Sequence, residues 1–200
     1  MKLVGMLDSP YVRRVAISLE LYGVDFEHQS LSVFSTFEQF SAINPVVKAP
    51  TLVMDDGTVL MDSSLILDYF EALAPTDKKL LAQDASARAK ELQVLGLALA
   101  ACEKTVQIVY EHHLRPAEKL YEPWVERVTG QLLAAYALLD KHLAQPNGEP
   151  LTQAALTSAV AWSFTQLKLP NLLKADAFPN LQRHARLLEQ HAAFRKYPIE

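Results

Sequence analysis

The sequence predicts an α/β N-terminal domain followed by an all-helical C-terminal domain. Over residues 1–75, short apolar runs alternate with helix-like segments, and a hairpin signal at Asp55–Gly57 joins two of the runs. From Asp84 onward only helical patterns occur, and prolines and polar turns separate them. We therefore expect strands and helices at residues 1–75, a linker at residues 76–84, and helices alone at residues 85–200.

Local start and end signals define the first predicted elements. Lys2–Met6 is a short apolar run that predicts a first strand. Ser9 and Pro10 form a cap and first-turn pair, so a helix should begin there and end near Gly23. A second strand and a second helix are expected at Val24–Leu31 and Phe34–Ile43.

Pro50 directly precedes the β-prone run Thr51–Met54. Proline has no amide proton and is confined to strand edges, first positions and bulges, so the backbone before it is left open to an extended peptide. The Pro50 peptide bond is also a candidate for the cis isomer. Val59–Met61 completes the hairpin, and Asp62-Ser63-Ser64 opens a helix over Ser63–Leu73. Because helix starts favour carboxylates, this region predicts a site for a short acidic peptide.

The second half reads as a series of helices. Each one begins or ends at a proline or a polar turn, as at Arg115-Pro116 and Gln145–Gly148. The expected helices are Ala85–Leu114, Glu122–Leu143, Thr152–Leu167 and Pro179–Ala192.

The amino-acid composition argues against several classes of function. The 200 residues carry 19 Lys and Arg against 23 Asp and Glu, a net charge of −4, without a basic run, which argues against a nucleic-acid partner. The single cysteine, Cys102, cannot form an intramolecular disulfide, so a reducing cytoplasm is expected. No segment is expected to span a membrane. His112 and His113 diverge on a helix and lack companions, so no metal is expected.

Three landmarks in order carry a family resemblance: Ser9–Arg13 after the first strand, Asn44–Pro50, and Asp62-Ser63 before the third helix. With them, residues 1–75 resemble the N-terminal domain of the glutathione transferase superfamily, and the remainder resembles its helical domain. The nearest likeness is to bacterial theta- or beta-type members. The resemblance implies a thioredoxin-like βαβαββα unit with a mixed four-stranded sheet, a homodimer, a role in detoxification, and a helical domain that contributes the electrophile pocket.

The thiol chemistry would have to come from a ligand. Thioredoxins carry two cysteines at the start of the first helix, and Ser9–Val12 has none, so the resemblance implies bound glutathione as co-substrate. A thiol with a pKa of about 8.5 needs hydrogen bonds and positive potential to ionise at neutral pH. Ser9 is our candidate donor and Tyr11 a weaker one; the alternative is that Ser9 only caps the helix. Asp8 would oppose a neighbouring thiolate.

The resemblance also implies a set of glutathione contacts. Lys48 would bind the glycyl carboxylate, and the backbone of Ala49 beside Pro50 would bind the cysteinyl residue. Asp62 would hold the γ-glutamyl ammonium and Ser63 its carboxylate. Ordinary surface and capping roles are the alternatives for these side chains. A contact from an acid of the partner subunit stays open, because the expected segment 92–102 has none and Glu103 is only a substitute.

The expected function is a glutathione transferase that activates the thiolate for attack on a hydrophobic electrophile. The same first half would serve a glutathione-dependent peroxidase or isomerase. A transferase-fold binding or interaction protein with little or no catalysis is the alternative of a different class.

Overall fold

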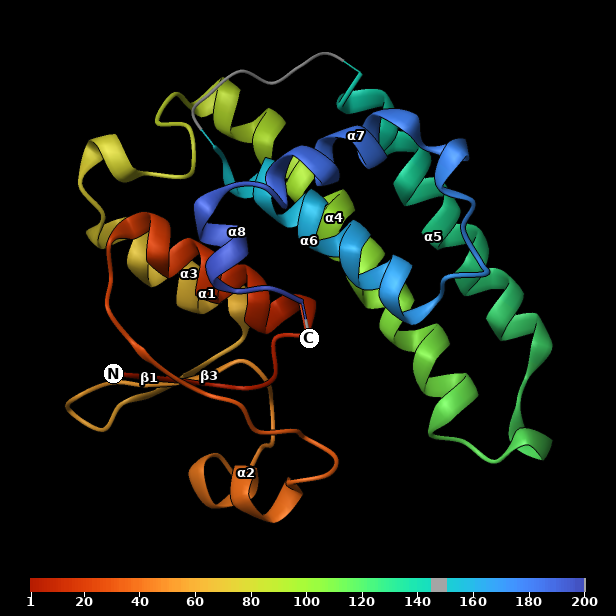
Figure 1. Ribbon diagram of the computed structural model, residues 1–200, viewed down its shortest axis with the longest axis horizontal. Coiled ribbons are helices and arrows are strands. Elements are labelled where there is room, and N and C mark those ends of the chain that lie inside the picture. Colours follow the sequence, from red (N-terminus) through yellow and green to blue (C-terminus); the bar gives the residue numbers. More distant parts are fainter. Residues whose placement is uncertain (145–150, 200) are drawn as a thin grey trace. The chain divides into compact units, whose positions relative to one another are not determined.

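The computed structural model describes residues 1–144 and 151–199 (Figure 1). The chain divides into two compact units, Met1–Leu81 with Gln190–Glu200, and Ala82–Glu189. The sequence predicts one helical domain over residues 85–200, whereas the structure groups residues 190–200 with the first unit.

The first unit is built on a four-stranded mixed sheet with the order β2-β1-β3-β4. Strand β1 is parallel to β2 and antiparallel to β3, and β3 is antiparallel to β4. The predicted order of strands and helices is confirmed. The bounds are β1 Lys2–Val4, α1 Pro10–Tyr22, β2 Glu27–Gln29, α2 Phe37–Ile43, β3 Thr51–Val53, β4 Val59–Met61, α3 Ser63–Leu73, a 3-10 turn at Thr76–Lys78, and α8 Ala192–Lys196.

Two predicted boundaries move for local reasons. The second strand is shorter than expected because Gly23, at φ 75°, and Val24 close the end of α1, with the amide of Val24 donating to Leu19 at 2.9 Å. This is the Schellman arrangement. Helix α2 begins at Phe37 rather than Phe34, because the hydroxyl of Ser32 accepts the amide protons of residues 34 and 35 at 3.1 Å each and holds a turn there.

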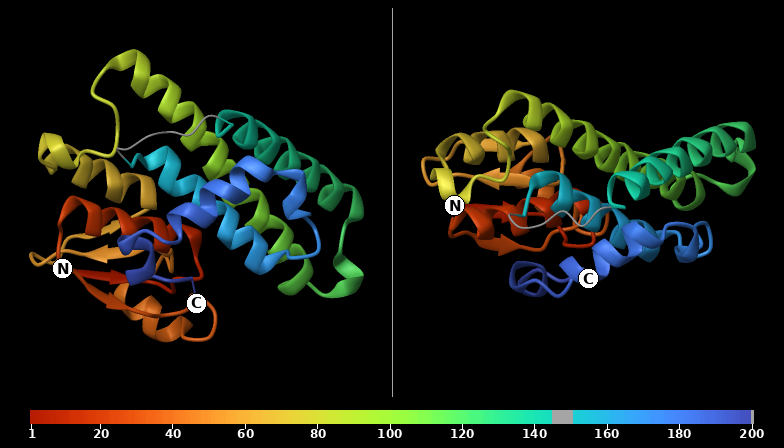
Figure 2. Two further views of the ribbon diagram at one scale, coloured as in Figure 1. Left: turned by 45° about the horizontal axis from the view of Figure 1, so that its top comes forward. Right: turned by 90° about the horizontal axis from the view of Figure 1, so that it is seen from above.

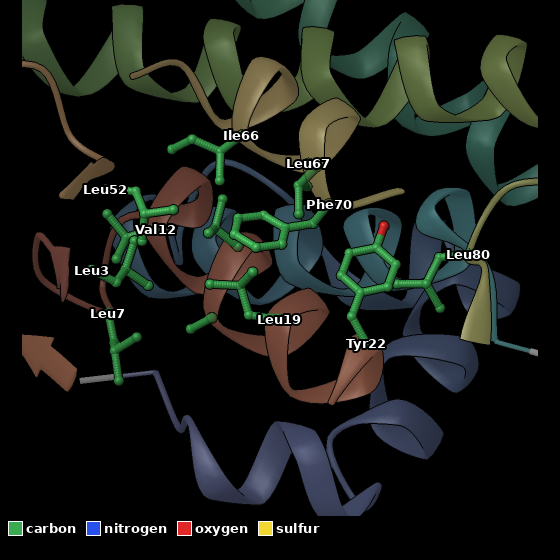
Figure 3. Packing of buried hydrophobic residues seen from close by; sticks show 12 residues of the cluster. Leu3, Leu7, Val12, Leu19, Tyr22, Leu52, Ile66, Leu67, Phe70 and Leu80 are labelled. Atoms are coloured by element: carbon green, nitrogen blue, oxygen red, sulfur yellow. The ribbon is translucent and has the colours of Figure 1, made fainter. Parts of the chain in front are cut away.

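Helices α1 and α3 cover one face of the sheet and α2 lies on the other (Figure 1). Successive side chains of β1 point to opposite faces of the sheet, since side chains alternate along a strand. Leu3 belongs to the core under α1 and α3, while Val4 packs with Leu31 and Phe40. In the first of these cores, side chains from α1 and α3 point toward one another over the strands (Figure 3).

The last segment of the chain packs on α1 (Figure 2). The guanidinium of Arg13 is buried in α1 and donates from Nε to the carbonyl oxygen of Tyr197 at 2.9 Å. Nearby, Nζ of Lys196 lies 2.6 Å from Oε2 of Glu20. The ring of Tyr197 stacks on Phe26 with centroids 5.5 Å apart. Buried, polar and aromatic contacts therefore fix this segment to the first unit.

The second unit is helical, as predicted. Helix α4 packs against α5 and α6, and α7 packs against α6 and α5. The predicted break at Gln145–Gly148 lies outside the described residues. The bounds are α4 Ala85–His113, a 3-10 turn at Ala117–Lys119, α5 Glu122–His142, α6 Gln153–Lys168, a 3-10 turn at Ala175–Ala177, and α7 Pro179–Leu188.

The predicted helix Pro179–Ala192 is in fact two helices. Helix α7 ends at Leu188, and α8 begins at Ala192 with His191 as its cap, because Nδ1 of His191 accepts the amide proton of Ala193 at 3.2 Å. A residue that caps a helix has extended backbone, so it separates the two segments.

Helix α4 is long and apolar enough, by length and composition, to cross a membrane, whereas the sequence predicted no such segment. Length and composition do not distinguish such a helix from the core helix of a bundle. In the structure α4 buries Leu95, Ala98, Cys102 and Ile108 and packs on two neighbouring helices. Of the apolar stretch of α4, 33% is buried inside the structure.

Candidate functional site

The loop before β3 is braced by two buried polar side chains. Asn44 donates from Nδ2 to the hydroxyl of Thr51 at 2.9 Å, and its Oδ1 accepts the amide proton of Val46 at 3.0 Å. The hydroxyl of Thr51 in turn donates to the carbonyl of Lys48 at 2.7 Å. This chain of bonds fixes the path of the backbone between α2 and β3.

That path holds the predicted peptide-binding residues at the start of β3. Val47 has φ 51°, a left-handed conformation that is costly for a β-branched residue and that clusters at functional sites. The Ala49–Pro50 peptide bond is cis, and Pro50 is buried directly before β3. The side chain of Lys48 is exposed.

Gly5 brings the start of α1 and this loop close together. It follows β1 with φ 139°, and its amide donates to the carbonyl of Gln29 at 3.1 Å. A Cβ at this position would lie 2.5 Å from Cγ2 of Val12 and 3.3 Å from Cβ of Ala49. Only glycine allows this close approach. Sequence reasoning missed Gly5, although a glycine that interrupts a strand pattern is a known signal for close backbone approach.

The start of α3 lies beside the loop. Asp62 precedes α3 with φ 67°, and its Oδ1 caps the helix by accepting the amide proton of Ser64 at 2.9 Å. Its other oxygen, Oδ2, lies 3.7 Å from Nζ of Lys48. Ser63 is the first residue of α3 and is 2% exposed. The structure thus brings Lys48, Asp62 and Ser63 together.

Arg14 is a second residue of this region that sequence reasoning missed. It lies in α1, is 1% exposed, and donates from Nη1 to the hydroxyls of Ser63 at 3.2 Å and Ser64 at 3.3 Å. The available signal was an arginine pair, Arg13 and Arg14, in a helix whose other central residues are apolar. Long polar side chains are rarely buried without a partner, so such a pair suggests specific interactions.

Ser9 begins α1 as its N-cap. Its hydroxyl accepts the amide proton of Val12 over a long 3.4 Å. A serine hydroxyl has one proton and two acceptor positions, so a cap that uses an acceptor position leaves the proton to donate elsewhere. The capping role is therefore present, and it is chemically compatible with a second role. Asp8 and Tyr11 on either side are half-buried.

The remaining sequence candidates lie elsewhere. Cys102 is fully buried in α4, as expected of a small core residue. His112 and His113 are exposed in the last turn of α4. Within residues 1–144 and 151–199, no group of three or more His, Cys, Asp and Glu side chains is arranged to hold a metal ion.

Two comparisons with known proteins point to one family. The family model for the glutathione S-transferase N-terminal domain matches residues 3–78. A glutathione transferase family member from Pseudomonas fluorescens Pf-5, solved with bound glutathione, is 28% identical to this chain. The match covers 100% of this chain and 98% of that one, with a TM-score of 0.85. Both matches support the glutathione transferase superfamily as the family of this chain.

Curated relatives within the superfamily differ in activity. A maleylacetoacetate isomerase of Pseudomonas aeruginosa is 27% identical over 98% of this chain and 94% of its own length. Glutathione S-transferase U4 of Arabidopsis thaliana is 27% identical over 65% of this chain, and the matched region spans 61% of that protein, less than two thirds of it. The expected theta- or beta-like class stays a prediction.

Proposed function

We propose that this protein binds reduced glutathione in its first unit and activates the thiolate for attack on a hydrophobic electrophile. The observation that carries the proposal is the grouping of Lys48, Asp62 and Ser63 where the loop before β3 meets the start of α3. A cation, an anion and a hydroxyl at a helix start complement a peptide with one ammonium and two carboxylates. The glutathione-bound relative from Pseudomonas fluorescens supports the same ligand.

In this proposal each part of glutathione has a partner. Lys48 binds the glycyl carboxylate, the backbone of Ala49 beside Pro50 pairs with the cysteinyl residue, Asp62 binds the ammonium, and Ser63 binds the γ-glutamyl carboxylate. The 3.7 Å ion pair between Lys48 and Asp62 is half-exposed, and such pairs contribute about 0–1 kcal/mol. The ligand offers each partner an opposite charge, so binding exchanges a weak pair for two new ones.

Ser9 is proposed to stabilise the thiolate. Its hydroxyl proton is not used by the cap, and the amides and dipole at the start of α1 add positive potential. Both effects lower the pKa of a bound thiol from its ordinary value of about 8.5. Tyr11, in the first turn of α1, is the alternative donor.

Two experiments test the proposal. Calorimetric titration with reduced glutathione should give saturable binding in the micromolar-to-millimolar range that Ser63→Ala weakens. Turnover of chlorodinitrobenzene should decrease in Ser9→Ala and persist in Ser9→Thr, which keeps the hydroxyl. If the wild-type protein does not bind glutathione, the proposal is wrong.

A glutathione-dependent isomerase is the second candidate. The observation that favours it is the Pseudomonas aeruginosa maleylacetoacetate isomerase, which matches this chain over nearly the whole length of both proteins. Assays of isomerisation and conjugation, run with the same preparation, separate the two activities. Loss of both activities in Ser9→Ala would indicate that they share one thiolate.

We also propose a cytoplasmic homodimer. Three side chains of α3 spaced four residues apart, Leu65, Tyr69 and Leu73, are 66%, 44% and 63% exposed. An apolar stripe of this kind marks an interaction surface. Light scattering should give a dimer mass that Leu65→Lys, combined with Leu73→Lys, reduces to that of a monomer.

A further inference from the structure

The buried guanidinium of Arg14 sits where the proposed site begins. Arg14 comes from α1 and reaches the first turn of α3, where one nitrogen, Nη1, donates to two hydroxyls in succession, those of Ser63 and Ser64. Ser63 is buried, whereas Ser64 is exposed. One charged group therefore links a buried hydroxyl and a surface hydroxyl at the same helix start.

The chemistry of the donor fixes the direction of these hydrogen bonds. A guanidinium has donors and no acceptor, so both serine oxygens must act as acceptors toward Arg14. Each hydroxyl keeps a single proton, which it can give only to an acceptor. A serine oxygen has two acceptor positions, and Arg14 occupies one of them on each serine. Each hydroxyl is therefore biased toward using its proton as a donor to the ligand.

The positive charge of Arg14 also favours an anion at this position. The start of α3 carries the positive end of the helix dipole, and a buried cation beside it strengthens the local preference for an anion. Hydrogen bonds to a charged group are shorter and about twice as strong as neutral ones. A carboxylate would thus accept hydrogen bonds from two hydroxyl groups that Arg14 already biases toward donating.

We propose that Arg14 is a positioning residue of the glutathione site: it favours the donor role of Ser63 and Ser64 and so makes the start of α3 selective for the γ-glutamyl carboxylate. Ser64 is then a second contact to that carboxylate. This inference rests on the proposed function, because it assigns the residues that select one group of the same ligand.

Arg13 offers a matched control. It is the neighbouring arginine of the same helix and is also buried, but its Nε donates to the carbonyl of Tyr197 and its guanidinium lies 5.4 Å from the ring centre of Phe194. Arg13→Gln therefore removes a buried guanidinium from α1 without touching Ser63 or Ser64. A loss that is only structural should occur in both variants.

The test compares two ligands by calorimetry. One is reduced glutathione, and the other is its analogue in which the γ-glutamyl carboxylate is replaced by hydrogen. Arg14→Gln should weaken glutathione binding about tenfold or more, as expected for hydrogen bonds to a charged group, and leave the affinity for the analogue unchanged. Arg13→Gln should change neither affinity by more than about twofold, and Arg14→Lys should restore part of the loss.

Ser64→Ala keeps the test decisive if Arg14→Gln does not fold, since an exposed serine is easily replaced. It should weaken binding of glutathione and not of the analogue. Equal effects on the two ligands, or no effect on either, would overturn the inference. Failure of the wild-type protein to bind glutathione would instead overturn the proposed function, so the two failures are distinguishable.

Discussion

Tyr22 donates its hydroxyl proton to the buried carboxylate of Glu71 at 2.9 Å and so connects α1 with α3. The same carboxylate accepts the backbone amide protons of Leu80 at 3.0 Å and Leu81 at 3.2 Å. A single side chain thus holds two helices and the segment that leaves the first unit.

Replacing Glu71 should therefore destabilise the first unit. Glu71→Ala leaves three donors without their acceptor, and we expect a loss of about 3 kcal/mol in the free energy of unfolding, measured in urea. Tyr22→Phe removes only one of the bonds and should cost about 1 kcal/mol. If Glu71→Ala costs no more than Tyr22→Phe, the backbone bonds to residues 80 and 81 do not stabilise the protein.

Gly5→Ala should reduce both stability and ligand binding. The new methyl group would meet Val12 and Ala49, and its φ of 139° is unfavourable for alanine, so we expect a loss of about 2–3 kcal/mol. Displacement of Ala49 should also weaken glutathione binding.

Gly57→Ala is the matched control for that change. Gly57 also has positive φ, 85°, but no atom within 4 Å of an added Cβ, so only backbone strain of about 1 kcal/mol applies. It lies at the tip of the hairpin and should leave glutathione binding intact. Equal binding losses in the two glycine variants would contradict the role given to Gly5.

Ser9→Ala should separate capping from thiol activation. Loss of the cap costs about 1 kcal/mol of stability. Loss of the hydroxyl proton should raise the pKa of bound glutathione toward about 8.5, followed by the ultraviolet absorbance of the thiolate against pH. Ser9→Asp keeps a capping oxygen but adds a negative charge, so it should retain stability and still raise the thiol pKa. An unchanged thiol pKa in both variants would move the donor role to Tyr11.

Stability of the helical unit should depend on His184. Burial lowers the pKa of His184 below its ordinary value of 6.5. It outweighs the contact between Nε2 and the carbonyl oxygen of Ala155 at 2.9 Å, which raises the pKa, and the charge of Arg183 adds a smaller lowering. Between the lowered folded pKa and 6.5, the unfolded chain binds more protons than the folded one, so stability rises with pH.

The contribution of His184 is therefore complete above pH 6.5 and is lost as the pH falls through the folded pKa. His184→Gln should flatten urea unfolding curves measured as a function of pH across this range. His142→Gln replaces an exposed histidine at the end of α5 and serves as the control. A wild-type protein that becomes more stable on acidification would contradict the assignment.

Local signals predicted most of the elements. Ser9 and Pro10 begin α1, Gly23 ends it, Asp55–Gly57 turns the hairpin, and Asp62 caps α3, all through contacts with near neighbours in the sequence. Such signals can be recognised in the sequence because the residues that contact each other lie within a few positions of one another.

The long-range contacts that hold the first unit and its candidate site could not be predicted from such local signals. Arg14 contacts a serine 49 residues away, and Tyr22 and Glu71 are also 49 residues apart. Their partners are chosen by how α1 packs on α3, and no local pattern encodes that choice. Asn44 is the intermediate case, since its partner Thr51 is 7 residues away, across a loop whose conformation the sequence does not specify.

The bond from Arg13 to the carbonyl of Tyr197 joins residues 184 positions apart. At a synthesis rate of about 5–20 residues per second, the partner of Arg13 leaves the ribosome roughly 10–40 s after Arg13 itself. The sheet and its covering helices can assemble during that interval, but this buried guanidinium receives its carbonyl only after the whole helical unit has been made. The first unit to emerge is therefore the last to be completed.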